Sequence, residues 1–228
     1  MILLLVACLP PCYVWQLLQR HNPWPRIFLG GVTWIIGVDV SIHGKRSRKG
    51  EFLLLNHVSW IDIPLIGGVT GAAFVAHDGL ASIPLIRWLC SLNDTVFVAR
   101  HDRASVARQV ADVREAIRDT GALAIFPEGT TSDGTGLLSF KSSLLSALDP
   151  VPPGIVVQPV LLDYGLDTAT IAWVGDEPGL ANFLRIMARS DPIRATVHFL
   201  PPLAGEALAH RKTIAEAARS AILREMES

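Results

Sequence analysis

Two residues with the chemistry of a catalytic pair, His57 and Asp62, lie five positions apart in the segment Phe52–Pro64, FLLLNHVSWIDIP. A histidine can accept a proton near neutral pH, and a carboxylate behind it fixes its tautomer and stabilises the imidazolium. Five steps along an ideal helix turn about 500°, so two such residues inside one helix would point roughly 140° apart. His57 therefore meets Asp62 only from the turn before a helix or from the helix start.

The pattern of the segment predicts a strand, a turn and a helix in that order. Phe52–Asn56 is expected to be a buried strand, His57–Ser59 the turn, and Trp60 the beginning of the helix. In the alternative interpretation His57 caps the helix and Asp62 complements its dipole. His–Asp pairs at this spacing arise easily by chance, so the rest of the chain must decide between a general base and a cap.

The composition indicates a connection with lipid or membrane. The chain has 228 residues, enough for one sizeable α/β domain. Half of them are hydrophobic, 18% are charged and the mean hydropathy is +0.38, which is high for a soluble domain. A net charge of −1 gives no reason to expect a nucleic-acid partner. The three cysteines lack paired CxxC spacing, so we expect neither a disulfide framework nor a metal site.

The N-terminus is apolar. Residues 1–19 contain no charged side chain and are almost long enough to cross a bilayer as a helix. Pro10 and Pro11 interrupt this stretch, because proline is unfavourable in a helix interior. Two interpretations remain: a kinked or re-entrant single span, or two apolar half-helices lying in one leaflet.

The next segment, residues 24–38, carries tryptophans typical of an interfacial helix. An ordinary buried helix is the alternative. We therefore expect residues 1–37 to form an apolar, membrane-associating helical segment and residues 38–228 to form the main domain. Arg20, His21 and Arg26 follow the first apolar stretch. By the positive-inside rule, they predict that the main domain lies on the cytoplasmic side of the cell inner membrane.

Beyond residue 38, strand and helix patterns alternate. This predicts an α/β fold, a single domain with a mixed, largely parallel sheet flanked by helices. Strands are expected at 38–43, 52–56, 72–76, 95–99, 122–126, 154–163, 170–174 and 195–200. Helices are expected at 83–92, 102–119, 140–148, 178–188 and 206–227. Pro159, inside the strand predicted at 154–163, indicates an edge, a bulge or a strand break.

Polar or unusual residues accompany several of these strands in the manner of His57. Arg100 follows TVFVA, Pro127–Thr130 follows ALAIF, and Pro159 interrupts GIVVQPVLLD. Ligands of α/β proteins collect at the carboxyl ends of the strands. We therefore expect these positions to surround one cleft.

Four motifs together resemble, in order and spacing, the sequence blocks of the glycerolipid acyltransferase family: NHVSWID, VFVAR, FPEGTTSDG and VVQPV. The family includes the 1-acylglycerol-3-phosphate O-acyltransferases, and the resemblance covers residues 52–164. It implies a lysolipid acceptor with a free hydroxyl, and acyl-CoA or acyl-carrier protein as acyl donor. It also implies a site at the membrane surface, with no cofactor besides the donor substrate.

The resemblance assigns His57 as the general base that removes the proton of the acceptor hydroxyl, with Asp62 orienting it. An acyl transfer from a thioester needs an activated alcohol, and a base that titrates near neutral pH can supply one. By the same resemblance the acceptor is bound by the following residues: Arg100, Glu128, Gly129, Thr130 and Lys141.

One position departs from the family pattern. The third block usually reads FPEGTRS, whereas here Thr131 occupies the position of the arginine. A cation that would recognise phosphate is therefore missing. The resemblance favours conversion of 1-acyl-glycerol-3-phosphate (lysophosphatidate) to phosphatidate in phospholipid biosynthesis, and Thr131 leaves room for another acceptor such as lyso-ornithine lipid.

Two functions of other classes compete with acyl transfer. A non-catalytic lipid-binding membrane protein would keep the fold without the chemistry, and the intact His57 and Asp62 argue against it. A serine hydrolase of lipid esters would need a nucleophile elbow, and the sequence contains no GxSxG motif.

Overall fold

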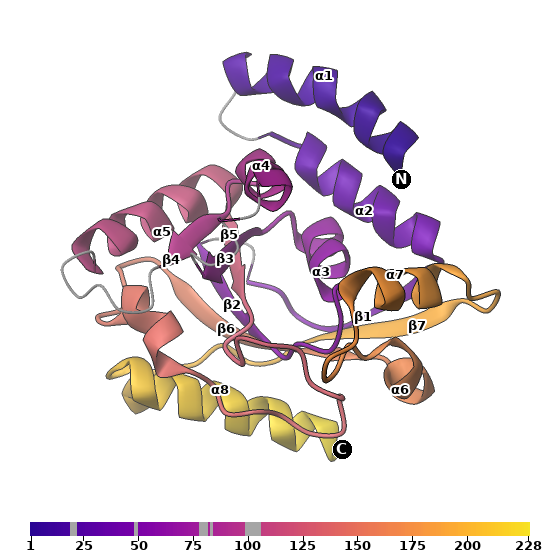
Figure 1. The fold of residues 1–228 in the computed structure, drawn as a ribbon. Helices are drawn as coiled ribbons and strands as arrows, with labels where there is room; N and C mark the ends of the chain where they lie inside the picture. The colour runs from indigo at the N-terminus through magenta and orange to yellow at the C-terminus, as the bar shows by residue number, and fades with distance from the viewer. Residues whose placement is uncertain (19–21, 48–49, 78–81, 83, 99–105) are drawn as a thin grey trace.

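The computed structural model describes residues 1–18, 22–47, 50–77, 82, 84–98 and 106–228 (Figure 1). These residues form a seven-stranded sheet whose strands lie in the order β1 (Val38–Gly44), β7 (Ile193–Phe199), β6 (Val156–Asp163), β2 (Glu51–Leu55), β5 (Ala122–Ile125), β3 (Ala73–His77) and β4 (Val96–Val98). Strands β6, β2, β5, β3 and β4 are mutually parallel. Strand β7 is antiparallel to β6 and parallel to β1. The predicted mixed, largely parallel sheet is thus confirmed.

Strand β2 lies at the centre of the sheet, and all five of its residues are buried. Phe52 and Leu54 pack into the apolar core on one face, while Leu53 and Leu55 pack into the core on the other. A strand covered on both faces needs apolar side chains at successive positions. This explains why the run FLLL precedes the His57 motif.

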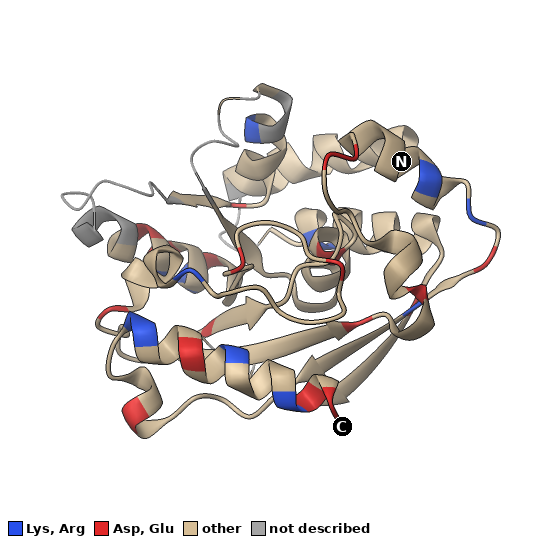
Figure 2. Ribbon diagram, turned by 60° about the horizontal axis from the view of Figure 1, so that its bottom comes forward, with Lys and Arg blue, Asp and Glu red and all other residues tan. Residues whose placement is uncertain are grey.

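Helices cover both faces of the sheet (Figures 1 and 2). The first core includes side chains of α5 (Val106–Thr120), the 3-10 helix η3 (Ser142–Leu148) and α8 (Arg211–Met226). The second core includes α2 (Trp24–Ile36), α3 (Asp62–Thr70), α6 (Thr168–Ile171) and α7 (Gly179–Met187). Helix α4 (Pro84–Leu92) and the short helices η4 (Gly165–Asp167) and η5 (Gly205–Leu208) lie between these elements in the chain.

The N-terminal apolar stretch is one helix, α1 (Ile2–Leu18), which continues through Pro10 and Pro11. The interpretation as two half-helices is therefore wrong. Helix α1 carries no charged side chain, in contrast to α8 (Figure 2). Among the residues that the structure describes, no helix combines the length and the hydrophobicity needed to cross a bilayer.

Helix α2 packs closely on α3. A Cβ atom placed on Gly68 would lie 2.7 Å from the Cα atom of Gly30, so the two backbones approach each other at a pair of glycines. Val32 and Ile36 of α2 are buried against the core, whereas Trp34 is 81% exposed. One face of α2 therefore belongs to the folded core, as in the buried-helix interpretation, and its other face is open.

The strand predicted at 170–174 is wrong. Residues Thr168–Ile171 form α6 instead. The carbonyl oxygens of Thr170 and Ala172 accept hydrogen bonds from the guanidinium of Arg185 on α7. Because a side chain satisfies these carbonyls, the segment is anchored to α7 and has no need of a sheet partner.

The predicted edge, bulge or break at Pro159 is also wrong, since Pro159 lies inside β6 between β2 and β7. Its carbonyl oxygen accepts a hydrogen bond from the Leu200 N–H, just beyond the end of β7. In a strand, the backbone N and O atoms of one residue face the same neighbouring strand. The nitrogen of Pro159, which lacks a hydrogen, therefore also faces the residues that follow the end of β7. The ladder with β7 begins one residue later, at the pair Val160–Phe199.

Candidate active site

His57 lies just past the carboxyl end of β2, and Asp62 is the first residue of α3. The chain turns between them, which brings the side chains together: His57 Nδ1 lies 2.7 Å from Asp62 Oδ2. Asp62 is fully buried, and the His57 side chain is 16% exposed. The predicted strand-turn-helix geometry and the predicted pairing are both present.

Four donors converge on the Asp62 carboxylate. Oδ2 accepts from His57 Nδ1 and from the backbone N–H groups of Val58 and Ser59, at 2.7 and 2.9 Å. Oδ1 accepts from the Tyr164 hydroxyl at 2.5 Å. The carboxylate is therefore fixed in position, and it fixes the imidazole in turn. A proton on His57 Nδ1 leaves the lone pair on Nε2, the nitrogen a general base uses.

Glu128 supports the same histidine from its backbone. Its Oε1 accepts from the His57 N–H at 2.7 Å, and its Oε2 accepts from the Leu138 N–H at 2.9 Å. The side chain is 1% exposed, and this burial raises the pKa of the carboxyl group above its ordinary value despite the two hydrogen bonds. In this structure the carboxylate therefore holds the turn that carries His57.

Further hydrogen bonds join the loop after β5 to the turn of His57. The backbone N–H of Ser132 donates to the His57 carbonyl oxygen at 2.7 Å, and the Trp173 N–H donates to the Val58 carbonyl oxygen at 3.0 Å. The Thr131 hydroxyl donates to the Trp173 carbonyl oxygen. Of the predicted cleft, the segments that follow β2 and β5 are therefore joined by one network of hydrogen bonds.

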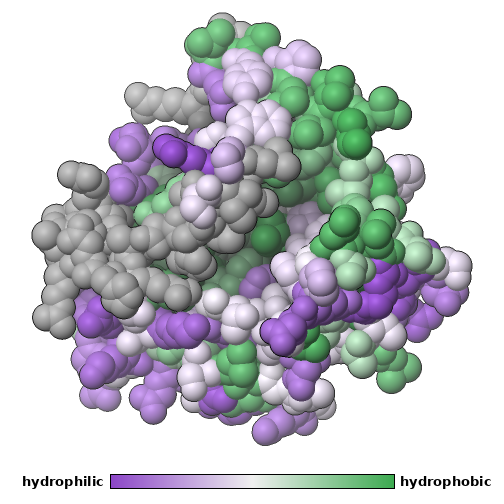
Figure 3. Space-filling model, in the orientation of Figure 1, coloured by the Kyte–Doolittle hydropathy of each residue, from purple (hydrophilic) through white to green (hydrophobic). Residues whose placement is uncertain are grey.

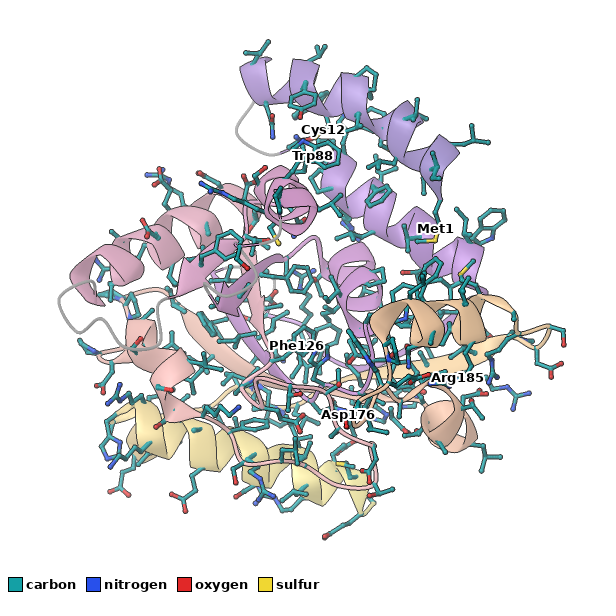
Figure 4. All side chains as sticks on the ribbon, viewed as in Figure 1. Met1, Cys12, Trp88, Phe126, Asp176 and Arg185 are labelled. Atoms are coloured by element: carbon teal, nitrogen blue, oxygen red, sulfur yellow. The ribbon has the colours of Figure 1, made fainter. Side chains whose placement is uncertain are left out.

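A large, mostly apolar cavity of about 930 Å³ includes His57 in its lining. Phe126 stacks on the imidazole with ring centroids 4.1 Å apart, and Figure 4 shows Phe126 in the interior of the molecule. The cavity extends between α1, α2, α3 and α4, so its lining includes Leu5, Cys8, Leu9, Cys12, Trp24, Phe28 and Leu89. Figure 3 shows a hollow on this face, with hydrophobic side chains of the N-terminal helices beside it.

The other residues predicted to bind the acceptor do not all lie at the cavity. Gly129 and Thr130 line the cavity. Gly129 has a φ of +69°, and a Cβ atom there would lie 3.0 Å from Lys141 Nζ, so the lysine passes directly over it. Lys141 is exposed and is not among the residues that line the cavity. Arg100 lies outside the described residues.

Sequence reasoning missed two residues of the site, Phe126 and Tyr164. Tyr164 follows β6, which lies beside β2 in the sheet, so its hydroxyl reaches Asp62. The signal available in the sequence was its place directly after an apolar strand, as with His57. Pro159, predicted to stand at the same edge, lies within the strand instead. Phe126 also follows a strand, but an aromatic residue at that position is typical of the end of a buried apolar strand and does not indicate a functional site.

The arrangement can perform base catalysis at the end of an apolar cavity. A fixed carboxylate behind the histidine stabilises the imidazolium that forms when a proton is removed. An apolar cavity of this size accommodates a hydrocarbon chain beside the base. No cluster of side chains that could bind a metal ion occurs among the described residues.

Comparisons with known proteins agree on one family. A family model described as Acyltransferase matches residues 38–163, more than half of the 228 residues. A lyso-ornithine lipid O-acyltransferase of Rhizobium meliloti is 34% identical over 212 residues, covering 86% of this chain and 70% of that protein. A 1-acyl-sn-glycerol-3-phosphate acyltransferase of Neisseria gonorrhoeae is 33% identical over 130 residues, covering 57% and 50% of the two chains.

The crystal structure of the 1-acyl-sn-glycerophosphate (LPA) acyltransferase PlsC of Thermotoga maritima has the same fold. It aligns with a TM-score of 0.62 and 23% identity, covering 95% of this chain and 86% of that one. The stretch matched by the family model contains His57, Asp62 and the FPEGT loop, which are among the motifs that resemble the family. The protein therefore belongs to the glycerolipid acyltransferase family and is an acyltransferase.

Proposed function

We propose that the protein transfers a fatty acyl group from a thioester, acyl-CoA or acyl-carrier protein, to the free hydroxyl of a lysolipid. The observation that carries this proposal is the His57–Asp62 pair, joined at 2.7 Å and facing an apolar cavity of about 930 Å³. A thioester is already activated toward alcohols, so the chemistry needs a base and positioning rather than a protein nucleophile.

In the proposed reaction, Nε2 of His57 removes the proton of the acceptor hydroxyl as its oxygen attacks the thioester carbonyl carbon. The tetrahedral intermediate then collapses, the carbon–sulfur bond breaks, and the imidazolium returns its proton to the departing thiolate. Asp62 stabilises the imidazolium between these two steps. Glu128 acts as a positioning residue, because its carboxylate holds the backbone of His57.

We favour lyso-ornithine lipid as the acceptor. The relative from Rhizobium meliloti bears that name and matches 86% of this chain, against 57% for the lysophosphatidate-type relative from Neisseria gonorrhoeae. Thr131 supplies no cation for a phosphate, and its hydroxyl is engaged by Trp173. Lysophosphatidate, which the motifs alone favoured, is the second candidate. The exposed ammonium of Lys141 beside Gly129 supports it, since an ammonium group can pair with a phosphate.

We further propose that the N-terminal segment associates with the membrane surface and that the catalytic site faces it from the cytoplasmic side. Exposed apolar side chains along α1 support this, since Leu3 and Leu17 are 85% and 87% exposed. The same helix lines the cavity. A lysolipid in the cytoplasmic leaflet would therefore have a short path to His57.

Acylation by the purified full-length protein in lipid vesicles tests the proposed function. Labelled acyl-CoA and acyl-carrier protein are supplied with lyso-ornithine lipid, with lysophosphatidate, or without acceptor. We expect acylated lyso-ornithine lipid as the main product, and His57→Ala should lower its rate at least about 100-fold. The matched control His43→Ala, at an exposed strand position, should keep the wild-type rate.

Three outcomes would contradict the proposal. Full activity of the His57→Ala protein would remove His57 from its role as base. Release of free fatty acid without acceptor would favour a hydrolase. Binding of lipid with no product from any lysolipid would favour the non-catalytic lipid-binding protein.

A further inference from the structure

The loop Trp173–Glu177 forms part of the wall of the cavity that contains His57. The backbone of its first residue, Trp173, makes hydrogen bonds through both its N–H group and its carbonyl oxygen. The Trp173 N–H donates to the carbonyl oxygen of Val58, next to the candidate base, and the Trp173 carbonyl oxygen accepts from Thr131. The residue that replaces the family's arginine therefore anchors this loop beside the base.

Side chains of α7 hold the residue that directly precedes this loop. The buried Asn182 donates to the carbonyl oxygen of Ala172 at 3.3 Å, and Arg185 donates to it at 3.0 Å. The Trp173 indole closes the loop by donating to the carbonyl oxygen of Glu177 at 2.8 Å. These hydrogen bonds hold the backbone of the loop beside the cavity.

Two carboxylates of this loop, Asp176 and Glu177, are the acidic side chains among the described residues that line the cavity, and no lysine or arginine is in that described lining. Glu177 is neutralised: Arg185 lies 2.9 and 3.0 Å from its two oxygens, and these hydrogen bonds lower the pKa of Glu177. Asp176 has no ion pair within the described part of the chain, and Arg185 pairs with its neighbour Glu177. Figure 4 shows Asp176 and Arg185 on neighbouring segments.

Asp176 is exposed at the cavity, and an unpaired carboxylate there repels a phosphate and attracts an ammonium group. We propose that Asp176 binds a protonated amine in the head group of the acceptor, and so selects a lysolipid with an amine over one with a terminal phosphate. This inference rests on the proposed acyl transfer to a lysolipid. The side-chain amine of ornithine resembles that of lysine, which is protonated at neutral pH, and has the required chemistry.

Steady-state kinetics of the full-length protein in vesicles tests this role. Three acceptors are compared: lyso-ornithine lipid, the same lipid with its amine acetylated, and lysophosphatidate. Asp176→Asn removes the charge and keeps the shape. Asp191→Asn, at an exposed residue outside the described cavity lining, makes the same change of net charge and is the control.

We expect Asp176→Asn to raise the KM for lyso-ornithine lipid about tenfold, the effect of one charge-assisted hydrogen bond, with kcat nearly unchanged. The acetylated lipid should be a poor substrate of the wild type and should lose less than about twofold in kcat/KM on the same substitution, since the interaction is already absent. Asp176→Lys should raise the ratio of lysophosphatidate to lyso-ornithine activity. Asp191→Asn should match the wild type.

The inference is overturned if Asp176→Asn slows the amine-bearing and the acetylated lipid by the same factor, because a merely structural role would do that. It is also overturned if the wild type acylates both lipids equally well. These results differ from a failure of the proposed function, in which the wild type would acylate none of the three acceptors.

Discussion

Tyr164 and His57 are bound to opposite oxygens of one buried carboxylate. The Tyr164 hydroxyl donates to Asp62 Oδ1 at 2.5 Å, while Oδ2 is 2.7 Å from His57 Nδ1. Burial, together with the nearby charge of Asp62, raises the pKa of Tyr164 well above 10. Tyr164 therefore stays a protonated donor across the neutral range, and it joins the end of β6 to the turn that carries His57.

Among substitutions around this carboxylate, we expect the largest loss of kcat from the one that most disturbs the tautomer of His57. Asp62→Asn should lower kcat by roughly 10³ to 10⁴, because the amide no longer selects the Nδ1-protonated form. Tyr164→Phe should lower kcat by only about tenfold, the loss of one hydrogen bond. Steady-state acylation at saturating acceptor measures both, with Tyr13→Phe, outside the described cavity lining, as the control. Wild-type rates for Asp62→Asn would refute the orienting role.

Glu128→Gln should weaken the hold on His57, because a carboxamide offers one acceptor oxygen where two backbone N–H groups donate. The pKa of Glu128 is raised from its ordinary 4.5, so its contribution to stability is complete below that pH and is lost as the pH rises through the folded value.

The free energy of unfolding of the wild type should therefore exceed that of Glu128→Gln by an amount that shrinks from about pH 4.5 towards neutrality. Urea unfolding at a series of pH values measures it. A difference that does not change with pH would show that burial does not perturb this carboxyl group. Activity should fall in the variant at all pH values, since the turn of His57 loses a contact.

The glycine pair between α2 and α3 offers a sharp comparison. An alanine Cβ at Gly68 would lie 2.7 Å from the Gly30 backbone, whereas one at Gly30 would lie 3.8 Å from Gly68. Gly68→Ala should destabilise the protein by about 1–3 kcal/mol and displace α2, which lines the cavity. Gly30→Ala should be neutral or stabilising by up to about 1 kcal/mol, since alanine favours helix. Equal effects in thermal unfolding would contradict the close packing.

Charges on the exposed side of α1 should release the protein from lipid. Leu3 and Leu17 are 85% and 87% exposed, so glutamates there cost little in the folded protein but are unfavourable in a bilayer interface. The double variant should lose most of its co-sedimentation with vesicles. Leu166→Glu, at a fully exposed leucine in η4, is the control and should still bind. Undiminished binding of the double variant would exclude α1 as the contact.

The sequence predicted the parts of this site that depend on local patterns. The apolar run before Asn56 required a strand buried on both faces, and the spacing of His57 and Asp62 required a turn between them. Both features follow from rules that act over a few residues. The family motifs added the loop at Glu128, although the sequence alone did not reveal that its carboxylate would face the backbone of His57.

Features that depend on which strands are neighbours were missed. Tyr164 reaches Asp62 only because β6 lies beside β2, and the order of strands is not written in any local pattern. The same cause explains the mistaken strand at 170–174, whose carbonyls are satisfied by a side chain 13 to 15 residues later, Arg185. Arg100, predicted to bind the acceptor, lies outside the described residues, so its role stays a prediction.

The cavity has a mixed origin: α1 and α2 contribute Leu5, Cys12 and Phe28 to it, and the α/β sheet contributes His57. The division into a segment of residues 1–37 and a domain of residues 38–228 therefore does not separate attachment from catalysis. A shortened protein beginning at Val38 would lack part of its substrate-binding wall, whatever its solubility. Under the membrane attachment proposed above, the same helix would contact lipid and shape the cavity, so bilayer composition is expected to influence which acyl chains the enzyme accepts.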